Sequence, residues 1–358
     1  MAKIAIVADS HFGAKSESHV LLQHFDKFYQ NVFFPYIEKH GIKHCIHLGD
    51  LVDRRKYINY QILHYIRHEI IERLWKNNVD THLILGNHDT SFKNSNRINA
   101  QEELFTTHVG EEEPWIYSKP KVIEIDGFPI ALLPWINSEN IEESMKFINT
   151  ARSSVLAGHL ELSGFEMHSG FLNTEGMDKH LLNRFEMVIT GHYHHKSTDG
   201  TIYYVGSPYQ ITWADYNDER GFHIFDTSTR KLTFIQNPYD LFFKIYYDDS
   251  KAETLEDLKH LIDADKFRNA FIKIIVVDKN NPTLFNDFMD ELNKLEPESV
   301  SVIENYVSSI EEIDSLDLSQ DTLTILQSHV DASGRKIDKN KIKDVLRKLW
   351  FEAISNER

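Results

Sequence analysis

The stretch from Thr81 to Asp89 constrains the fold more than any other part of this sequence. An apolar run, Leu83 to Leu85, ends at Gly86, and three polar residues follow at once: Asn87, His88 and Asp89. A short apolar run with a sharp end is typical of a buried strand, and glycine at that end permits a tight turn or a close backbone approach. The polar residues are therefore expected at the carboxyl end of a strand, where open α/β sheets carry their ligand sites.

Four other predicted strands end in the same way. Their terminal acid and imidazole groups are Asp9 and His11, Asp50 and Asp53, His159, and His192 and His194. Carboxylate, imidazole and amide donors without a competing thiolate suit Mn, Fe or Zn. Seven candidate ligands are too many for one ion but suit two ions, roughly 3.5–4 Å apart, that share a carboxylate; such a pair clamps the attacking and leaving oxygens of a phosphate ester. The candidates are Asp9, His11, Asp50, Asn87, His159, His192 and His194.

The order of predicted elements indicates an α/β fold. Predicted strands at 4–8, 44–48 and 81–85 alternate with helical patterns at 19–40 and 58–75, which is the signature of βαβ units. Asp126-Gly127 predicts a hairpin between 121–125 and 129–133. Further strands at 154–157, 187–190, 202–205, 222–225 and 232–235, with a helix at 143–151, suggest two stacked sheets with helices outside.

The alternation resets near Pro238, which predicts three parts. Residues 1–238 form the main domain, 239–328 a small acidic α/β domain with a β-α-β-α-β order, and 329–358 a linker and a last helix. That helix, 339–354, carries apolar residues on one face and lysines and arginines on the other, and Asp338 can cap it.

Composition excludes several classes of protein. The one cysteine, Cys45, excludes a disulfide framework and favours a reducing compartment. No signal-peptide pattern or membrane-length apolar stretch is present, so a soluble cytoplasmic protein is expected. The net charge of −16 arises mainly between positions 248 and 321, where 19 acidic and 7 basic residues give −12. Global acidity therefore bears on solubility and not on the site.

The ordered motifs D-x-H, G-D-x-x-D-R, G-N-H-D, G-H and G-H-x-H resemble those of the calcineurin-like metallophosphoesterases. The chain resembles more specifically the SbcD-like DNA repair nucleases (the meiotic-recombination-eleven family), with T-even phage members closest. Asp9-Ser10-His11-Phe12-Gly13 and Gly206-Ser207-Pro208-Tyr209-Gln210 carry this second likeness, together with the small domain and the last helix. The resemblance implies a four-layer α-β-β-α sandwich with a small α/β capping domain and a helical tail.

The resemblance also implies roles for single residues. One metal would be held by Asp9, His11, Asp50 and His194, and the other by Asp50, Asn87, His159 and His192. His88 would protonate or stabilise the leaving oxygen, oriented by Asp89. Related nucleases often carry His at the position of Asp53, whose interpretation stays open between a helix cap, support for a ligand, and a ligand.

Other polar residues have simpler interpretations. His44, His47, His82, His108 and His195 are expected to be packing or surface histidines. Arg54, Arg55 and Lys56 are expected either to follow a phosphate backbone or to form a solvated charge run.

Together these features predict a DNA nuclease that uses two Mn²⁺ ions, with Fe²⁺, Zn²⁺ or Mg²⁺ as alternatives. The resemblance adds a homodimer and an SMC-like (SbcC-type) ATPase partner bound through the last helix; its apolar face includes Ile342, Leu346, Leu349 and Trp350. Two other functions remain open: a phosphatase or small-molecule phosphodiesterase with the same site, and a DNA-end scaffold with little catalysis.

Overall fold

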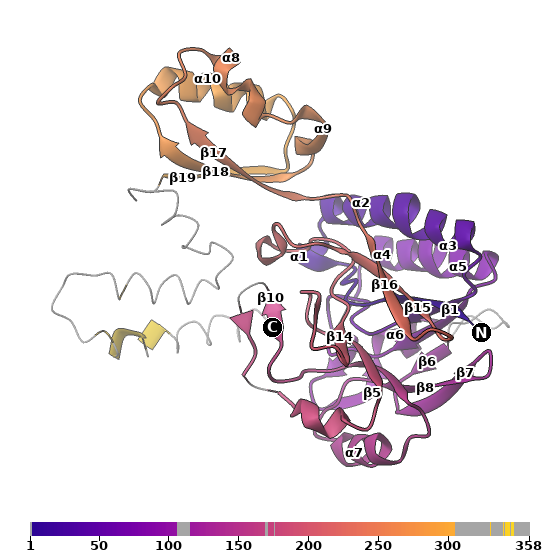
Figure 1. Cartoon of the computed structure of the whole chain (residues 1–358). Coiled ribbons are helices and arrows are strands. Elements are labelled where there is room, and N and C mark those ends of the chain that lie inside the picture. Colours follow the sequence, from indigo (N-terminus) through magenta and orange to yellow (C-terminus); the bar gives the residue numbers. More distant parts are fainter. Residues whose placement is uncertain are drawn as a thin grey trace. The chain divides into compact units, whose positions relative to one another are not determined.

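A computed structural model describes residues 2–105, 115–168, 171–174 and 176–304, and positions 330, 339, 341–343, 345 and 346. The chain divides into two compact units (Figure 1). The first comprises residues up to 211 and 217–241, and the second comprises 212–216 and the described residues from 242 onward. Both alternate strands and helices, so the predicted α/β class is confirmed.

The first unit contains two six-stranded sheets. In the first sheet the order is β16-β15-β1-β2-β3-β6 and the four strands from β1 to β6 are parallel. These strands are β1 (Lys3–Val7), β2 (His44–His47), β3 (Asp80–Ile84), β6 (Trp115–Tyr117), β15 (Gly221–Asp226) and β16 (Lys231–Gln236).

The second sheet has the order β13-β14-β12-β9-β8-β7, again with four parallel strands, β14 to β8. Its strands are β7 (Lys121–Ile125), β8 (Phe128–Leu133), β9 (Val155–His159), β12 (Met187–Gly191), β13 (Ser197–Thr198) and β14 (Ile202–Tyr204). Asp126 and Gly127 turn β7 into β8 with φ of 51° and 75°, which is the two-residue turn that the sequence predicts.

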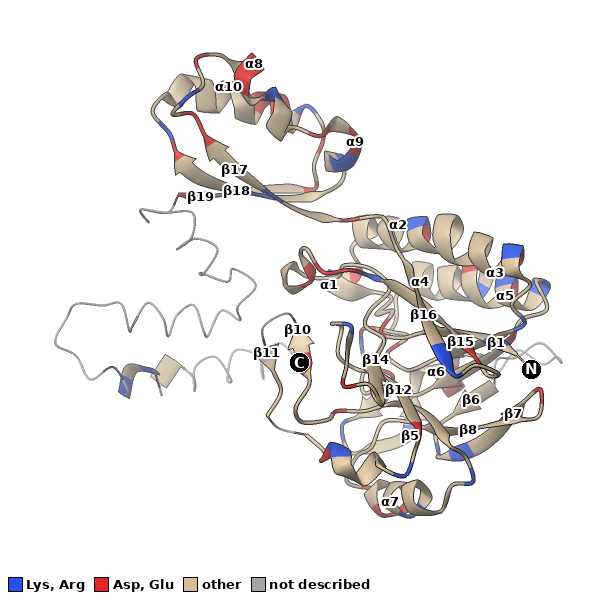
Figure 2. Cartoon of the chain, viewed as in Figure 1, with Lys and Arg blue, Asp and Glu red and all other residues tan. Residues whose placement is uncertain are grey.

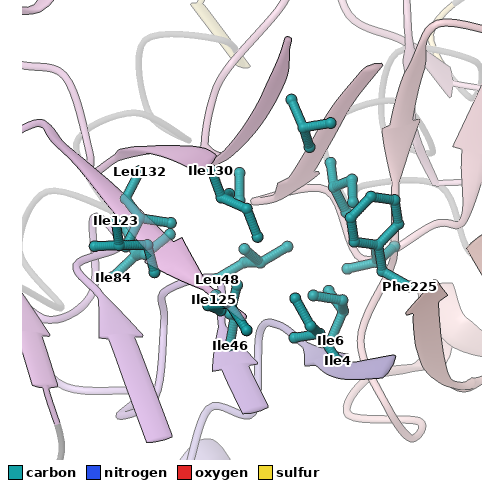
Figure 3. Close-up of a cluster of buried hydrophobic side chains, with 14 of the residues drawn as sticks. Ile4, Ile6, Ile46, Leu48, Ile84, Ile123, Ile125, Ile130, Leu132 and Phe225 are labelled. Carbon is teal, nitrogen blue, oxygen red and sulfur yellow. The ribbon is translucent and has the colours of Figure 1, made fainter. Parts of the chain in front are cut away.

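Alternate residues of the two sheets form one hydrophobic core between them (Figure 3). Ile4, Ile6, Ile46 and Leu48 of the first sheet pack with Ile125, Ile130 and Leu132 of the second, and all are nearly inaccessible to solvent. Because side chains alternate along a strand, Val7, Cys45 and Leu83 face the other side of the first sheet, where helical residues such as Tyr29 and Ile70 cover them. The outer side of the second sheet packs against Ile148 of α7 (Ile141–Thr150). Burial on both faces explains the continuous apolar runs in the sequence.

The helices of the first unit lie where the sequence predicts them, with one irregularity in each long segment. Residues 19–40 form α2 (His19–Phe28), a π-turn η1 (Tyr29–Phe33) and α3 (Phe34–His40), which ends at left-handed Gly41. Pro35 lacks an N–H and stands in the first turn of α3, where a helix tolerates that loss. Residues 60–76 repeat the pattern as α4 (Tyr60–Tyr65), η2 (Ile66–Ile71) and α5 (Glu72–Lys76).

Shorter elements complete the first unit, and several of them were not predicted. They are α1 (Ala14–Glu17), the hairpins β4 (Thr90–Phe92) with β5 (Ser95–Asn99) and β10 (Glu166–His168) with β11 (Phe171–Leu172), α6 (Ala100–Phe105), α7 (Ile141–Thr150), and η3 (Lys179–Leu182).

The second unit is a three-stranded parallel sheet, β17-β18-β19, with helices on one face. Its elements are η4 (Trp213–Asp215), β17 (Phe242–Asp248), α8 (Leu255–Leu258), η5 (Lys259–Leu261), α9 (Ala264–Phe267), β18 (Phe271–Asp278), α10 (Pro282–Asn293) and β19 (Ser299–Glu304). The first helix of the predicted β-α-β-α-β order is only the short pair α8 and η5. Acidic side chains recur along α8 to α10 (Figure 2).

The predicted C-terminal helix lies mostly outside the described residues, including Leu349 and Trp350. Positions 339, 341–343, 345 and 346 are helical. Within the part of the chain that is described, no helix is long and apolar enough to cross a membrane.

Candidate metal centre

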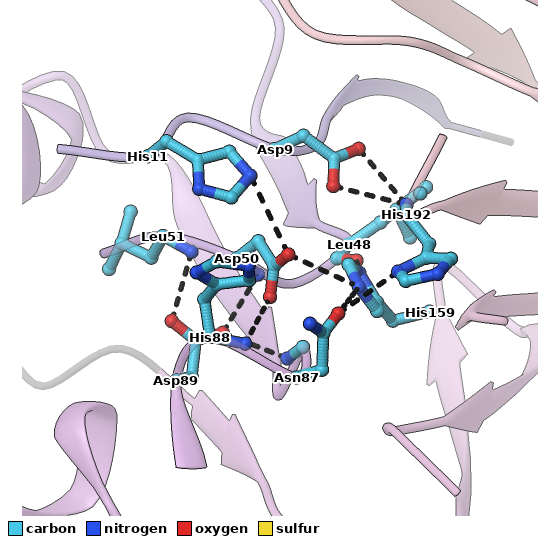
Figure 4. A network of polar contacts seen from close by, with 12 residues as sticks. Asp9, His11, Leu48, Asp50, Leu51, Asn87, His88, Asp89, His159 and His192 are labelled. Carbon is cyan, nitrogen blue, oxygen red and sulfur yellow. Dashed lines mark hydrogen bonds and ion pairs between the residues drawn. The ribbon is translucent and has the colours of Figure 1, made fainter. Parts of the chain in front are cut away.

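The predicted polar strand ends meet in one place (Figure 4). Asp9 and His11 follow β1, Asp50 follows β2, and Asn87 and His88 follow β3; from the second sheet, His159 ends β9 and His192 and His194 follow β12. Asp9 accepts hydrogen bonds from the His192 backbone N–H at 3.0 and 3.1 Å, which ties the two sheets together. The carboxyl ends of both sets of parallel strands therefore supply one site.

Three of these side chains form a first donor group: Asp9, His11 and His194. One atom of each lies within 4.8 Å of the others. Nε2 of His11 and Nε2 of His194 are 3.0 Å apart. Two imidazole nitrogens directed at each other and at a carboxylate are a donor set for a cation.

A second donor group contains Asp50, His159 and His192, also within 4.8 Å. The Asn87 Oδ1 lies 3.0 Å from both His159 Nε2 and His192 Nδ1. His159 is fully buried, and its Nδ1 lies 2.7 Å from the Leu48 carbonyl oxygen. A proton on Nδ1 makes that contact a hydrogen bond and leaves the Nε2 lone pair directed into the group, as in metal-ligating histidines.

Asp50 lies between the two groups. Its Oδ2 is 3.6 Å from His11 Nε2 in the first group and 3.5 Å from His159 Nε2 in the second. Its Oδ1 accepts a hydrogen bond from the His88 backbone N–H at 2.7 Å. Asp50 therefore has the position of a carboxylate that bridges two ions.

The electrostatics of the centre fit cation binding. Burial, with the neighbouring Asp50, raises the pKa of Asp9 to about 7. Burial also opposes the charged form of Asp50, but His159 and the other imidazoles outweigh it and hold the pKa of Asp50 well below its usual value. Since buried carboxylates are costly unless paired or bound to metal, this donor set fits two divalent cations.

Four residues of the centre have a strained backbone conformation. Asp9, His11, Asp50 and His192 all have positive φ, at 53°, 44°, 53° and 98°. Non-glycine residues adopt such conformations at a cost of about 1–3 kcal/mol, and the cost is tolerated where the surrounding structure or function requires it. Each of these side chains is thereby turned from its strand end into the centre.

His88 is held by the peptide oxygen of Asp53 and not by Asp89. Its Nδ1 lies 2.6 Å from that oxygen, and its ring packs edge-on against His11 at 4.7 Å between centroids. The Asp53 Oδ1 is 3.3 Å from His11 Nδ1, so Asp53 supports two histidines at once. Asp53, His11 and His88 also have donor atoms within 4.8 Å of one another, so the interpretation of Asp53 stays open between support for a ligand and a ligand.

The prediction that Asp89 orients His88 is wrong, because the carboxylate oxygens of Asp89 accept hydrogen bonds from other groups. Oδ2 of Asp89 accepts from Asp50 N, Gly86 N and Gln101 Nε2 at 2.8, 2.8 and 3.0 Å. Its Oδ1 accepts from Leu51 N and Val52 N at 3.0 and 3.2 Å. Three of these five donors belong to the loop after β2, and Asp89 therefore supports the loop that carries Asp50.

Four of the five histidines expected to have packing or surface roles contact polar groups outside the centre. His47 Nε2 lies 2.8 Å from Ser10 Oγ, His82 Nδ1 lies 2.9 Å from Tyr117 Oη, and His195 Nδ1 lies 2.9 Å from Asp218 Oδ2. His44 pairs with Asp80 and Asp126. His108 lies outside the described residues.

Comparison with known proteins identifies the family to which this chain belongs. Residues 2–196 match the calcineurin-like phosphoesterase family, and the chain belongs to that family. The predicted class, a metal-dependent phosphoesterase, is thereby confirmed.

Within this family, the chain is similar to two proteins that are named as nuclease subunits. The chain is 32% identical over 334 residues to exonuclease subunit 1 of Enterobacteria phage T4, a match that covers 92% of each chain. It is 22% identical over 257 residues to the SbcD component of the SbcCD nuclease of Staphylococcus epidermidis, covering 64% of this chain and 67% of that protein. The predicted resemblance to SbcD-like nucleases is confirmed. A match to the solved structure of an archaeal phosphodiesterase covers 66% of this chain and 99% of that protein, at 16% identity and a TM-score of 0.33.

Proposed function

We propose that this chain is a two-metal DNA nuclease. The observation that carries the proposal is the pair of donor groups joined by Asp50. Asp9, His11, Asp50 and His194 would hold one ion, and Asp50, Asn87, His159 and His192 the other. When bound, such an ion pair lowers the pKa of an attacking water and stabilises the charge that develops on a phosphodiester.

Mn²⁺ is the proposed ion at both positions. The donors are carboxylate, amide and imidazole, and the one cysteine, Cys45, is buried in β2. Fe²⁺, Zn²⁺ and Mg²⁺ are competitors for such a set, because carboxylate and imidazole ligands do not select strongly among them.

His88 would act as the general acid for the leaving oxygen. Nδ1 must carry a proton to donate to the Asp53 peptide oxygen, so only the imidazolium form of His88 has a second proton, on Nε2, to give to the leaving oxygen. Burial lowers the pKa of His88, although the nearby Asp50 opposes that shift. General acid catalysis of this kind typically contributes 10²–10⁴-fold to the rate.

DNA is proposed as the substrate because two relatives are named as nucleases, one of them matched along 92% of this chain. Both names also describe parts of larger enzymes, which supports a partner; an SMC-like (SbcC-type) ATPase bound through the last helix, and a homodimer, are part of the proposal. A phosphatase with the same centre is the second candidate, because its chemistry needs the same donors. The DNA-end scaffold is disfavoured since the sequence carries a donor at every ligand position that the resemblance implies.

The experiment is Mn²⁺-dependent cleavage of an end-labelled DNA, run beside hydrolysis of p-nitrophenyl phosphate. We expect DNA shortening that requires Mn²⁺ and disappears in Asp50→Ala. Intact DNA with rapid release of nitrophenol would instead assign the chain to the phosphatases.

His88→Ala separates catalysis from binding. We expect cleavage to fall by about 10²–10⁴-fold, with two Mn²⁺ ions still bound by calorimetry because His88 is not among the proposed ligands. Loss of Mn²⁺ binding in this variant would contradict the role of general acid.

A further inference from the structure

A seven-residue segment, Arg54–Tyr60, leads away from the metal centre and combines positive charge with exposed aromatic rings. Arg54, Arg55 and Lys56 are consecutive cations in a chain of net charge −16. Tyr57 is 59% exposed, and Tyr60, at 87%, is the most exposed large hydrophobic side chain among the residues that the structure describes. The metal centre as proposed uses none of these side chains.

The segment is held in place at both ends. Asp53 N donates to the Phe12 carbonyl oxygen at 3.0 Å, and the Asp53 peptide oxygen contacts His88. At the other end, Asn59 caps α4 by accepting from Gln61 N at 2.8 Å and donates to Glu17 Oε2 at 2.8 Å. The two tyrosine rings are therefore held in solvent by an ordered backbone.

One of the cations also contacts one of the aromatic rings. The Arg54 guanidinium lies over the Tyr57 ring, 5.0 Å from its centroid. Tyr57 follows Asp53 by four residues, which keeps its Cα within about 14 Å of the Asp53 Cα. A strand held at the metal centre would thus meet this segment within a few nucleotides.

We propose that Arg54–Tyr60 is a binding platform for single-stranded DNA; this inference rests on the proposed nuclease function. Proteins bind single strands by combining cations along the backbone with aromatic rings on which bases stack. Unpaired bases expose the faces that Tyr57 and Tyr60 can cover, whereas a duplex hides them. The platform therefore selects the single strand as the form of DNA that reaches the centre.

A second copy of the chain is the competing occupant of this surface. In a two-fold symmetric contact the same patch lies on both sides of the interface, so a contact centred here would bring Arg54, Arg55 and Lys56 toward their own copies. That repulsion disfavours a dimer contact centred on this segment and favours a polyanion.

The test measures binding of the full chain to fluorescent oligo(dT) and to a blunt duplex, without added divalent ions so that cleavage does not intervene. We expect the double variant Tyr57→Ala/Tyr60→Ala to bind oligo(dT) at least about tenfold more weakly, with a smaller loss on the duplex. Tyr57→Phe/Tyr60→Phe should restore binding because phenylalanine keeps the stacking face. Trp75→Ala removes another exposed aromatic, 42% exposed on α5, and should bind like the wild type.

Lys56→Gln tests the contribution of charge. Neutralising one phosphate contact should reduce the slope of log affinity against log salt concentration by about 0.7 for a single strand. Lys39→Gln, at an exposed position on α3, is the matched control and should leave the slope unchanged.

Three outcomes would overturn the platform. These are oligo(dT) binding that is equal in the wild type and the tyrosine double variant, equal losses on single strand and duplex, and a double variant that loses a dimer by light scattering while keeping its oligo(dT) affinity. The last would assign the rings to a second copy. Failure of the nuclease proposal is separate, because it appears as a wild-type chain that does not cut DNA with Mn²⁺.

Discussion

At the scale of single residues, Asp89 shows how a carboxylate next in sequence to the proposed general acid, His88, can stabilise the backbone. It accepts hydrogen bonds from four peptide N–H groups and from Gln101, and it is fully buried. Asp89→Asn would place an amide NH₂ group, which is a donor, against N–H groups that also donate. We expect the free energy of unfolding to fall by roughly 3 kcal/mol, measured by urea denaturation.

Asp80→Asn is the matched control for Asp89→Asn. The Asp80 side chain is 66% exposed at the start of β3, and the same substitution there should change stability by less than about 0.5 kcal/mol. A stable Asp89→Asn protein that lost only catalysis would restore the orienting role that the sequence suggested.

A buried histidine away from the metal centre makes stability depend on pH. Burial, with the nearby Lys27, lowers the pKa of His24 from 6.5 to about 4. The folded protein therefore keeps this imidazole neutral, while the unfolded chain takes up a proton below pH 6.5. The stabilisation is complete above pH 6.5 and is lost as the pH falls toward 4.

His24→Phe should remove this dependence. Between pH 7 and pH 5 the His24 contribution changes by about 2 kcal/mol, so the difference in unfolding free energy between these pH values should shrink by that amount. His19→Phe, at an exposed position on the same helix, is the control. An unchanged pH dependence in His24→Phe would show that other groups control acid sensitivity.

At the scale of elements, the strand ends can approach one another because two glycines lack side chains. A Cβ on Gly86 would overlap both Oδ1 and the backbone nitrogen of Asp50. A Cβ on Gly49 would lie 2.6 Å from His159 Nδ1. The spacing of β2, β3 and β9 at the centre thus depends on these residues.

Gly86→Ala should displace Asp50 and disrupt the centre. We expect loss of the two-ion stoichiometry in Mn²⁺ calorimetry, because the bridging carboxylate cannot keep its position. Gly200→Ala is the contrast: Gly200 has φ of 96° but open space around its Cβ position, so it should cost only about 1 kcal/mol and leave Mn²⁺ binding intact. Normal Mn²⁺ binding by Gly86→Ala would contradict this dependence.

Much of this arrangement could be predicted from the sequence because its signals are local. Apolar runs that stop at glycine mark the strand ends, Asp126-Gly127 marks a hairpin, and Gly41 marks a helix end. The hairpin of β4 and β5 has no such signal, since Ser95 to Asn99 are mostly polar. The contacts of Asp89 with Asp50 and of Asp53 with His88 could not be predicted, because they join loops 39 and 35 residues apart.

At the scale of the whole molecule, most of the net negative charge and the proposed metal ligands lie in different parts of the chain. The proposed ligands all belong to the first unit, whereas residues 248–321 carry −12 of the net charge of −16. Bound divalent ions would add positive charge at the centre. A negative overall charge is thus compatible with a local site for an anionic substrate.

The last helix provides a prediction for assembly with other proteins. Ile342 and Leu346 are four residues apart, both are half-buried, and both positions are helical, so they share a face suited to a helix-in-groove contact. Ile342→Asp/Leu346→Asp should abolish co-elution with the proposed partner, an SbcC-type ATPase, on size exclusion, because burying two carboxylates in an apolar groove is strongly unfavourable. Lys341→Glu, an exposed neighbour, should retain co-elution. Co-elution that survives the double substitution would place the partner contact elsewhere on the chain.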